Sequence, residues 1–149
     1  FGGNVRALAH CAARCILPRG HPFGDVEEIP LPRLRKEWFI DLAEGSPLRQ
    51  RVDHMMKAIN VDRTIAAELR TLHGVVRLVE RGVGVAIVDP VASQLLDPES
   101  VTSHRLLPEI AWDIAQFVPR DRPLSAMGLA FADAVSSEID RLKRAGVVS

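Results

Sequence analysis

The sequence lacks the cysteine content of a disulfide-stabilised protein. Only Cys11 and Cys15 occur among its 149 residues, too few for a disulfide scaffold. If residues 12–18 form a strand, as their apolar character indicates, the two sulfurs lie roughly 13 Å apart at about 3.3 Å per residue. That separation is too long for a disulfide bond. We therefore expect both cysteines to be reduced, as in a cytoplasmic protein.

The sequence also lacks an excess of charge and a long apolar run. Nineteen basic residues balance nineteen acidic ones, so composition gives no support for nucleic-acid contact by this stretch. No apolar run is long enough to span a bilayer, and no signal-peptide pattern is present, so we expect no membrane partner. Because the chain opens FGGN without a methionine, we expect it to lie inside a longer protein.

Hydrophobic residues make up 47% of the chain, which is enough for a packed core. Their spacing predicts strands that alternate with helices, and hence an α/β fold with a largely parallel sheet. Residues 29–34 are expected to form a loop with one tight helical turn. Residues 83–88 are apolar without alternation, as in a central parallel strand covered on both faces. The remaining expected strands are 12–18, 38–42, 64–68, 101–107 and 112–118, and the expected helices are 48–59, 72–82 and one beginning at Ser125.

The patterns of cofactor and metal sites are missing. Gly82-Val83-Gly84 follows a helix and precedes a strand, the reverse of a dinucleotide fingerprint, so these glycines favour a tight helix exit and close packing. The five histidines, at positions 10, 21, 54, 73 and 104, form no pair with metal-ligand spacing. We therefore expect neither a metal nor a cofactor.

A catalytic site is likewise not expected. Ser46 is close in sequence to Asp41 and Asp53, and His54 and His73 are conceivable bases. However, Gly45-Ser46-Pro47 is not a nucleophile elbow, and a serine before a helix has the structural task of capping it. We therefore expect no enzyme activity.

Two loops remain as candidates for ligand binding. Each is expected to leave a strand and enter a helix, and ligands of open α/β sheets bind at the carboxyl ends of strands. Each offers a hydroxyl group and free backbone N–H groups at a helix N-terminus, which favour an anionic group, and Arg70 adds a guanidinium suited to a carboxylate. The alternative is that both loops contain ordinary helix caps and a solvated arginine. The candidate residues are Glu44, Gly45, Ser46, Arg70, Thr71 and Leu72.

Four stretches resemble the effector domain of LysR-type bacterial transcription regulators. Residues 15–23 read CILPRGHPF, and residues 29–34 read IPLPRL before WFI at 38–40. Residues 68–88 read ELRTLHGVVRLVERGVGVAIV, with Thr71 at the family's usual serine or threonine. Residues 117–125 read FVPRDRPLS and precede the last helix. The resemblance covers most of residues 12–142, in order and with natural spacings.

The resemblance implies a type II periplasmic-binding-protein-like fold, with one complete lobe, both hinge strands and the C-terminal helix of the second lobe. The complete lobe with its hinge strands would be residues 12–118, and residues 1–11 and 119–149 would be remnants of the other lobe. A DNA-binding winged helix-turn-helix domain would precede Phe1, outside this chain. The resemblance therefore implies that DNA is contacted only through that absent domain.

The resemblance further implies a small-molecule effector and a homo-oligomer, either a dimer or a tetramer. Leu48, Val52, Met55 and Met56 are the candidate pairing surface, although this face could equally pack on the sheet. Val88-Asp89-Pro90 and residues 104–110 resemble the branch that senses amino acids and opines. We thus expect a cytoplasmic sensor of a carboxylate-bearing metabolite. A transporter's solute-binding protein is the alternative, and an enzyme of the same fold is a more distant one.

Overall fold

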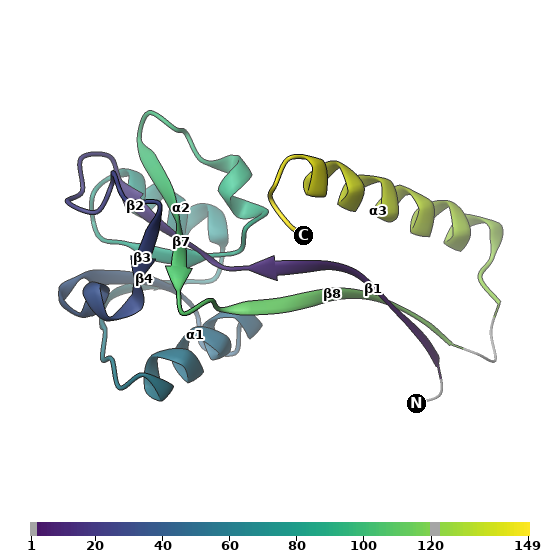
Figure 1. Ribbon diagram of the computed structural model, residues 1–149, viewed down its shortest axis with the longest axis horizontal. Coiled ribbons are helices and arrows are strands. Elements are labelled where there is room, and N and C mark those ends of the chain that lie inside the picture. The colour runs from purple at the N-terminus through teal and green to yellow at the C-terminus, as the bar shows by residue number, and fades with distance from the viewer. Residues whose placement is uncertain (1–2, 120–122) are drawn as a thin grey trace. The chain divides into compact units, whose positions relative to one another are not determined.

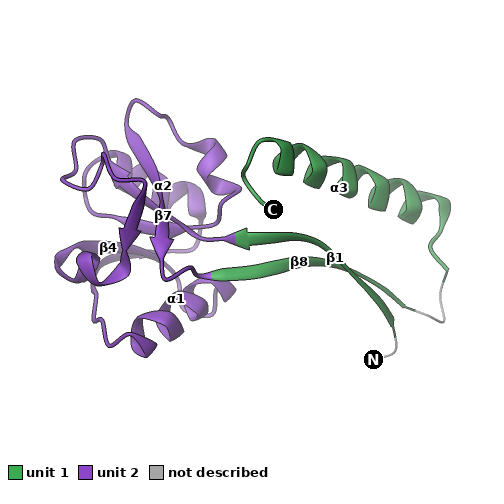
Figure 2. Ribbon diagram, in the orientation of Figure 1, with its two compact units in different colours: residues 1–11, 111–149 green, residues 12–110 purple. Residues whose placement is uncertain are grey.

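The computed structural model describes residues 3–119 and 123–149 of the chain. It is divided into two compact units, one made of residues 1–11 and 111–149 and the other of residues 12–110 (Figure 2). We call them unit 1 and unit 2. The expected lobe, residues 12–118, extends beyond unit 2 because the strand after residue 110 pairs within unit 1.

Strands and helices alternate along unit 2, as the hydrophobic spacing predicts (Figure 1). Its helical segments are α1 and α2 and the short 3-10 helices η1 and η2. The elements of unit 2 are β2 (Arg14–Pro18), β3 (Glu28–Pro30), η1 (Leu31–Lys36), β4 (Trp38–Leu42), α1 (Pro47–Ala58), β5 (Thr64–Leu69), α2 (Leu72–Glu80), β6 (Ala86–Val88), η2 (Ala92–Leu95) and β7 (Val101–Leu107).

Parallel strands dominate the sheet of unit 2, and β2 is the exception. Four strands pair in the order β3-β7-β2-β6, and β4 pairs with β5. A bridge between Phe39 and Val85 joins the two groups in parallel. Because β2 pairs antiparallel with both of its neighbours while β3–β7 and β4–β5 are parallel, only β2 runs against the rest. The prediction of an α/β fold with a largely parallel sheet is confirmed.

Helices cover both faces of this sheet. Val75, Val76 and Val79 of α2 pack with Ile40 and other buried residues of β2, β6 and β7 in one core cluster. Phe39 and Asp41 point to the opposite face, since successive side chains of a strand alternate. There Asp41 contacts Arg49 of α1, whose Val52 and Met56 are buried. Burial on both faces accounts for the largely apolar sequences of the inner strands β2 and β6.

The prediction for residues 83–88 is only partly correct. The strand β6 is limited to Ala86–Val88, all three buried, and it lies between an antiparallel neighbour and a parallel one. Gly82 ends α2 with φ 72°, and a Cβ on Gly84 would lie 2.3 Å from the Trp38 carbonyl oxygen. The two glycines therefore serve a helix exit and a close backbone approach, as predicted.

Two strands were not predicted. Residues 29–34 were expected to be a loop with a helical turn, and η1 confirms the turn, but β3 precedes it and pairs with β7. Residues 1–11 were expected only as a remnant, but β1 (Gly3–Ala12) occupies most of them. The predicted strand 12–18 is interrupted at Ala13, whose N–H donates to Ile110 at 2.8 Å.

Unit 1 consists of the paired strands β1 and β8 (Ala111–Pro119) and the helix α3 (Ala126–Arg144). Ser125 caps α3 as predicted, because its hydroxyl accepts from the Gly128 N–H. The apolar side predicted for this helix is covered only in part. Ile139 and Leu142 pack with Ala9 and Cys11, whereas Met127 and Phe131 are 82% and 70% exposed. Part of the resemblance to LysR-type regulators, residues 120–122, lies outside the described residues.

No helix in the described part of the chain is long and apolar enough to cross a membrane. Both cysteines are buried and neither is in a disulfide bond, as expected for reduced thiols. Burial raises the pKa of the Cys15 thiol well above its usual range, and the carboxylate of Glu37 adds to this effect. Cys15 is therefore a packing residue in its protonated form.

A buried valine tests the packing of α2 on the sheet. Val79 is fully buried in the core cluster of unit 2, so Val79→Ala should lower the free energy of unfolding by about 2 kcal/mol. Val83→Ala makes the same change at a residue that is 43% exposed and should cost less than about 0.5 kcal/mol. Chemical denaturation measures both variants, and equal losses would contradict the assigned packing.

Candidate functional site

The two candidate loops lie side by side at one edge of the sheet. The strands β4 and β5 pair in parallel with Leu42 opposite Leu69, so their carboxyl ends coincide. The Ala43 N–H donates to the Leu69 carbonyl at 2.8 Å, which extends the pairing into the loops. One loop leads into α1 and the other into α2, so five of the six candidate residues lie on adjacent connections, and the sixth, Leu72, begins α2.

The connection from β4 to α1 contains Glu44, Gly45 and Ser46. Glu44 and Gly45 are exposed, and Gly45 has φ 90°, a conformation that glycine adopts without strain. A Cβ at Gly45 would meet no atom within 4 Å, so the loop is open on this side. Pro47 occupies the first turn of α1, as predicted, and no acidic residue lies in that turn.

Ser46 is the N-cap residue of α1, but its hydroxyl does not cap the helix. Its carbonyl oxygen accepts from the Gln50 N–H at 3.0 Å, whereas its side chain makes no capping hydrogen bond. The sequence-based expectation that this serine has a capping task is therefore wrong for the side chain. Because the first N–H groups of a helix have no partner inside it, this end of α1 retains unused donors.

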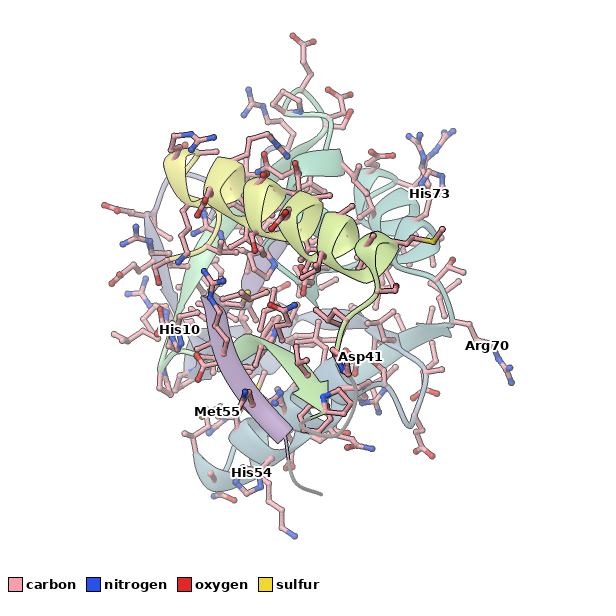
Figure 3. All side chains as sticks on the ribbon, turned by 90° about the vertical axis from the view of Figure 1, so that its right-hand side faces the viewer. His10, Asp41, His54, Met55, Arg70 and His73 are labelled. Atoms are coloured by element: carbon pink, nitrogen blue, oxygen red, sulfur yellow. The ribbon has the colours of Figure 1, made fainter. Side chains whose placement is uncertain are left out.

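The connection from β5 to α2 contains Arg70 and Thr71. The Thr71 hydroxyl accepts from the Gly74 N–H at 3.3 Å and so caps α2, as predicted. Its own proton remains free to donate. Arg70 is exposed and makes no hydrogen bond or ion pair with any residue that the structure describes. Figure 3 shows its guanidinium extending away from the ribbon. Leu72, partly buried, packs against the core cluster of unit 2.

A partly buried ionic network joins α1 to β4 and β5 next to these loops, and it was not predicted from the sequence. Arg49 in the first turn of α1 donates to Asp53, to Glu68 of β5 and to the Leu42 carbonyl. Arg63, between α1 and β5, contacts both Asp41 and Asp53. The side chains of Arg49, Arg63 and Asp41 are only 7%, 7% and 5% exposed.

Within the network, the hydrogen bonds favour the charged forms of Arg49 and Asp53. Burial alone would lower the pKa of Arg49, but its hydrogen bonds to Asp53 and Glu68 outweigh this and raise it. Burial would likewise raise the pKa of Asp53, but hydrogen bonds from Arg63 and Arg49 hold it below its ordinary value. Two sequence signals point to this network. Asp41 interrupts an apolar strand, where a carboxylate needs a partner, and Arg49 and Asp53 have helical i,i+4 spacing.

A pocket of about 290 Å³ lies at the other end of α1. Lys57, Asn60, Val61 and Asp62 line it, with Asp53 and Arg63 from the network. It is at the amino ends of the strands, whereas ligands of such sheets bind at the carboxyl ends. Among the residues that the structure describes, no group of His, Cys, Asp and Glu side chains is arranged to hold a metal ion.

Only part of the predicted pairing surface on α1 is exposed. Val52 and Met56 are each 2% exposed and pack within the chain. Leu48 and Met55, which share one side of the helix, are partly exposed. Packing on the sheet therefore accounts for two of the four residues, and a partner could contact only the other two.

Comparison with known proteins places these features in a family. Residues 2–140 match the family described as LysR substrate binding domain. The transcriptional activator protein LysR of Escherichia coli K12 is 24% identical over 128 residues, which are 86% of this chain and 41% of that protein. The chain thus spans less than half the length of this curated relative.

Solved structures share the fold. The CcmR regulatory domain of Synechocystis PCC6803 in complex with 2-PG superposes with a TM-score of 0.78 at 19% identity, over 92% of this chain and 67% of that one. The effector-binding domain of QuiR in complex with shikimate gives a TM-score of 0.71 at 17% identity, over 93% and 66%. Because the family match covers nearly the whole chain and these structures have the same fold, the chain belongs to the LysR substrate-binding domain family.

Proposed function

We propose that this chain is the effector-sensing part of a cytoplasmic LysR-type transcription regulator, and that its effector is a small carboxylate-bearing metabolite. The carboxylate would bind at the two adjacent loops that follow β4 and β5, with the other wall of the cleft supplied by the second lobe of the fold. DNA would be contacted by a separate helix-turn-helix domain. As in other two-state sensors, binding would favour one arrangement of the regulator over another.

The juxtaposition of two helix N-termini at one sheet edge carries this proposal. Both helices begin without an acidic residue in the first turn, so neither positive end is neutralised by its own sequence. The Ser46 hydroxyl is not used for capping, and Arg70 has no partner among the described residues. Backbone N–H groups, a hydroxyl and a guanidinium together match the hydrogen-bonding needs of a carboxylate.

Glu44 favours one group of effectors among the carboxylate-bearing metabolites. It is exposed in the same loop as Ser46, and its carboxylate suits an ammonium group. An effector with both a carboxylate and an ammonium group, such as an amino acid, would satisfy Arg70 and Glu44 together. The complexes of CcmR with 2-PG and of QuiR with shikimate support a small polar metabolite as the general class.

The first experiment is a thermal-shift screen of the intact regulator with the common L-amino acids, shikimate and 2-PG. A compound that binds only the folded state raises the melting temperature with concentration. Under this proposal the effective compounds carry a carboxylate, and their amides or methyl esters give no shift. Binding that survives loss of the carboxylate would contradict the proposed class.

Substitutions at the loops then test the assigned residues by calorimetry with the best compound of that screen. Arg70→Ala should weaken binding about tenfold to a hundredfold, because it removes a charge-assisted hydrogen bond. Arg81→Ala removes another exposed arginine, at the far end of α2, and should leave the affinity unchanged. Unchanged affinity in Arg70→Ala would refute its role.

Substitutions of Thr71 and Ser46 should change the stability of the protein by different amounts. Thr71→Val removes the cap of α2 and should cost about 1 kcal/mol of stability in addition to affinity. Ser46→Ala breaks no capping bond, so it should weaken binding while stability changes by less than about 0.5 kcal/mol. Equal stability losses would show that Ser46 has a capping role in solution, and unchanged affinity in both variants would exclude these hydroxyls from the site.

We further propose that the regulator is a homo-oligomer and that Leu48 and Met55 of α1 contact a second copy. Met55→Glu places a charge on that side of the helix and should shift the intact regulator toward smaller species in analytical ultracentrifugation. Lys57→Glu changes an exposed residue on another side of α1 and serves as the control. An unchanged sedimentation profile in Met55→Glu would place the interface elsewhere.

A further inference from the structure

Arg49 is a buried cation in an unfavourable position. It lies in the first turn of α1, where the helix carries partial positive charge and a cation is destabilised. Its side chain is only 7% exposed, so it has also lost most of its contact with water. A buried charge is tolerated only when it is paired and hydrogen-bonded. The partners of Arg49 therefore indicate what it does.

Two of those partners lie at the points where the two candidate loops begin. Arg49 Nη1 donates at 3.0 Å to the carbonyl of Leu42, the last residue of β4, and at 3.0 Å to Glu68, the residue before the end of β5. One guanidinium nitrogen thus joins the first turn of α1 to the ends of both strands. The Nε atom donates to the two carboxylate oxygens of Asp53 at 2.9 and 3.0 Å, which fixes the plane of the guanidinium.

A second arginine keeps this arrangement in place. Arg63 donates to Asp41 at 2.8 Å through Nε and also contacts Asp53, so both carboxylates that face Arg49 from β4 and α1 are held from the other side. The Arg63 guanidinium lies over the Phe39 ring, 5.8 Å from its centroid. Arg49 contacts three carboxylates, those of Asp41, Asp53 and Glu68. Leaving this position would therefore break several charge-assisted hydrogen bonds of one buried guanidinium at once.

We propose that Arg49 is a positioning residue of the effector site, which holds the loop at residues 43–46 and the turn at residues 70–71 in one fixed arrangement through Leu42 and Glu68. A site whose donors are already in place loses less conformational entropy when it binds. The part of the inference that concerns binding rests on the proposed function, whereas the part that concerns loop order does not.

Hydrogen–deuterium exchange of the intact regulator without added ligand tests loop order directly. Glu68 is 42% exposed and pairs only with Arg49 in the network, so Glu68→Gln should preserve the fold. In this variant we expect the hydrogen-bonded loop amides of Ala43 and Ser46 to exchange about tenfold faster, while the core amides of α2 keep their rates. Glu80→Gln breaks the Arg77–Glu80 pair on α2 and is the matched control, without effect at these loops.

Arg49→Lys tests whether loop order depends on the positive charge at this position or on the geometry of the guanidinium group. Lysine retains the positive charge but cannot bond to Leu42, Glu68 and both oxygens of Asp53 together. It should therefore show the same faster exchange in the loops as Glu68→Gln. If Arg49 only stabilised the fold, its substitution would instead accelerate exchange throughout unit 2. The urea concentration at the midpoint of unfolding would then fall by a corresponding amount. Equal loop exchange in the wild type, Glu68→Gln and Arg49→Lys overturns the proposal, and so does uniform acceleration.

The affinity of Glu68→Gln completes the test, measured with the amino acid, shikimate or 2-PG that gives the largest thermal shift. We expect a loss of about tenfold, although Glu68 itself lies beneath the loops and has no assigned role in binding. If Arg70→Ala weakens binding but Glu68→Gln does not, the positioning role is wrong and the proposed function stands. If Arg70→Ala, Ser46→Ala and Thr71→Val all bind normally, the site assignment fails, whatever the exchange rates show.

Discussion

The register in which β4 pairs with β5 determines where two helices begin. With Leu42 opposite Leu69 and the Ala43 N–H bonded to the Leu69 carbonyl, both strands end at the same level. Each is followed by a short connection, so the positive ends of α1 and α2 come to lie at one edge of the sheet. A shift of one residue would reverse the faces of β5 and separate Glu68 from Arg49.

The helices could be predicted because their signals are local. Pro47 at the start of α1, the Thr71 and Ser125 caps and the exit at Gly82 all act within a few residues, and all are observed. The directions of the strands are a different matter. The pairing of Arg14 with Arg105 and Val88 decides that β2 runs against the other strands, and this depends on residues far apart in the chain. Nothing in the sequence of residues 14–18 alone reveals it.

The positions of the candidate site residues could be predicted to a similar extent. Five of the six residues lie on adjacent connections and Leu72 begins α2, because the rule that ligands bind at the carboxyl ends of strands locates them without coordinates. Whether the hydroxyl group of each loop caps its helix could not be predicted. Ser46 and Thr71 occupy equivalent positions before their helices, but only Thr71 caps, a difference that depends on backbone geometry. The partners of Arg49 come from two strands and a helix, and only the folded chain brings them together.

The chain order of the two units has a consequence for their folding. Unit 2 is inserted between β1 and β8, which pair with each other in unit 1. Where the insert begins and ends, the Ala13 N–H bonds to the Ile110 carbonyl at 2.8 Å, so a folded insert holds its own ends together. If unit 2 unfolds, pairing β1 with β8 must close a loop of about 100 residues, at an entropic cost on the order of 4 kcal/mol. Folded unit 2 therefore stabilises the strand pairing of unit 1 through chain connectivity alone, because it removes this entropic cost.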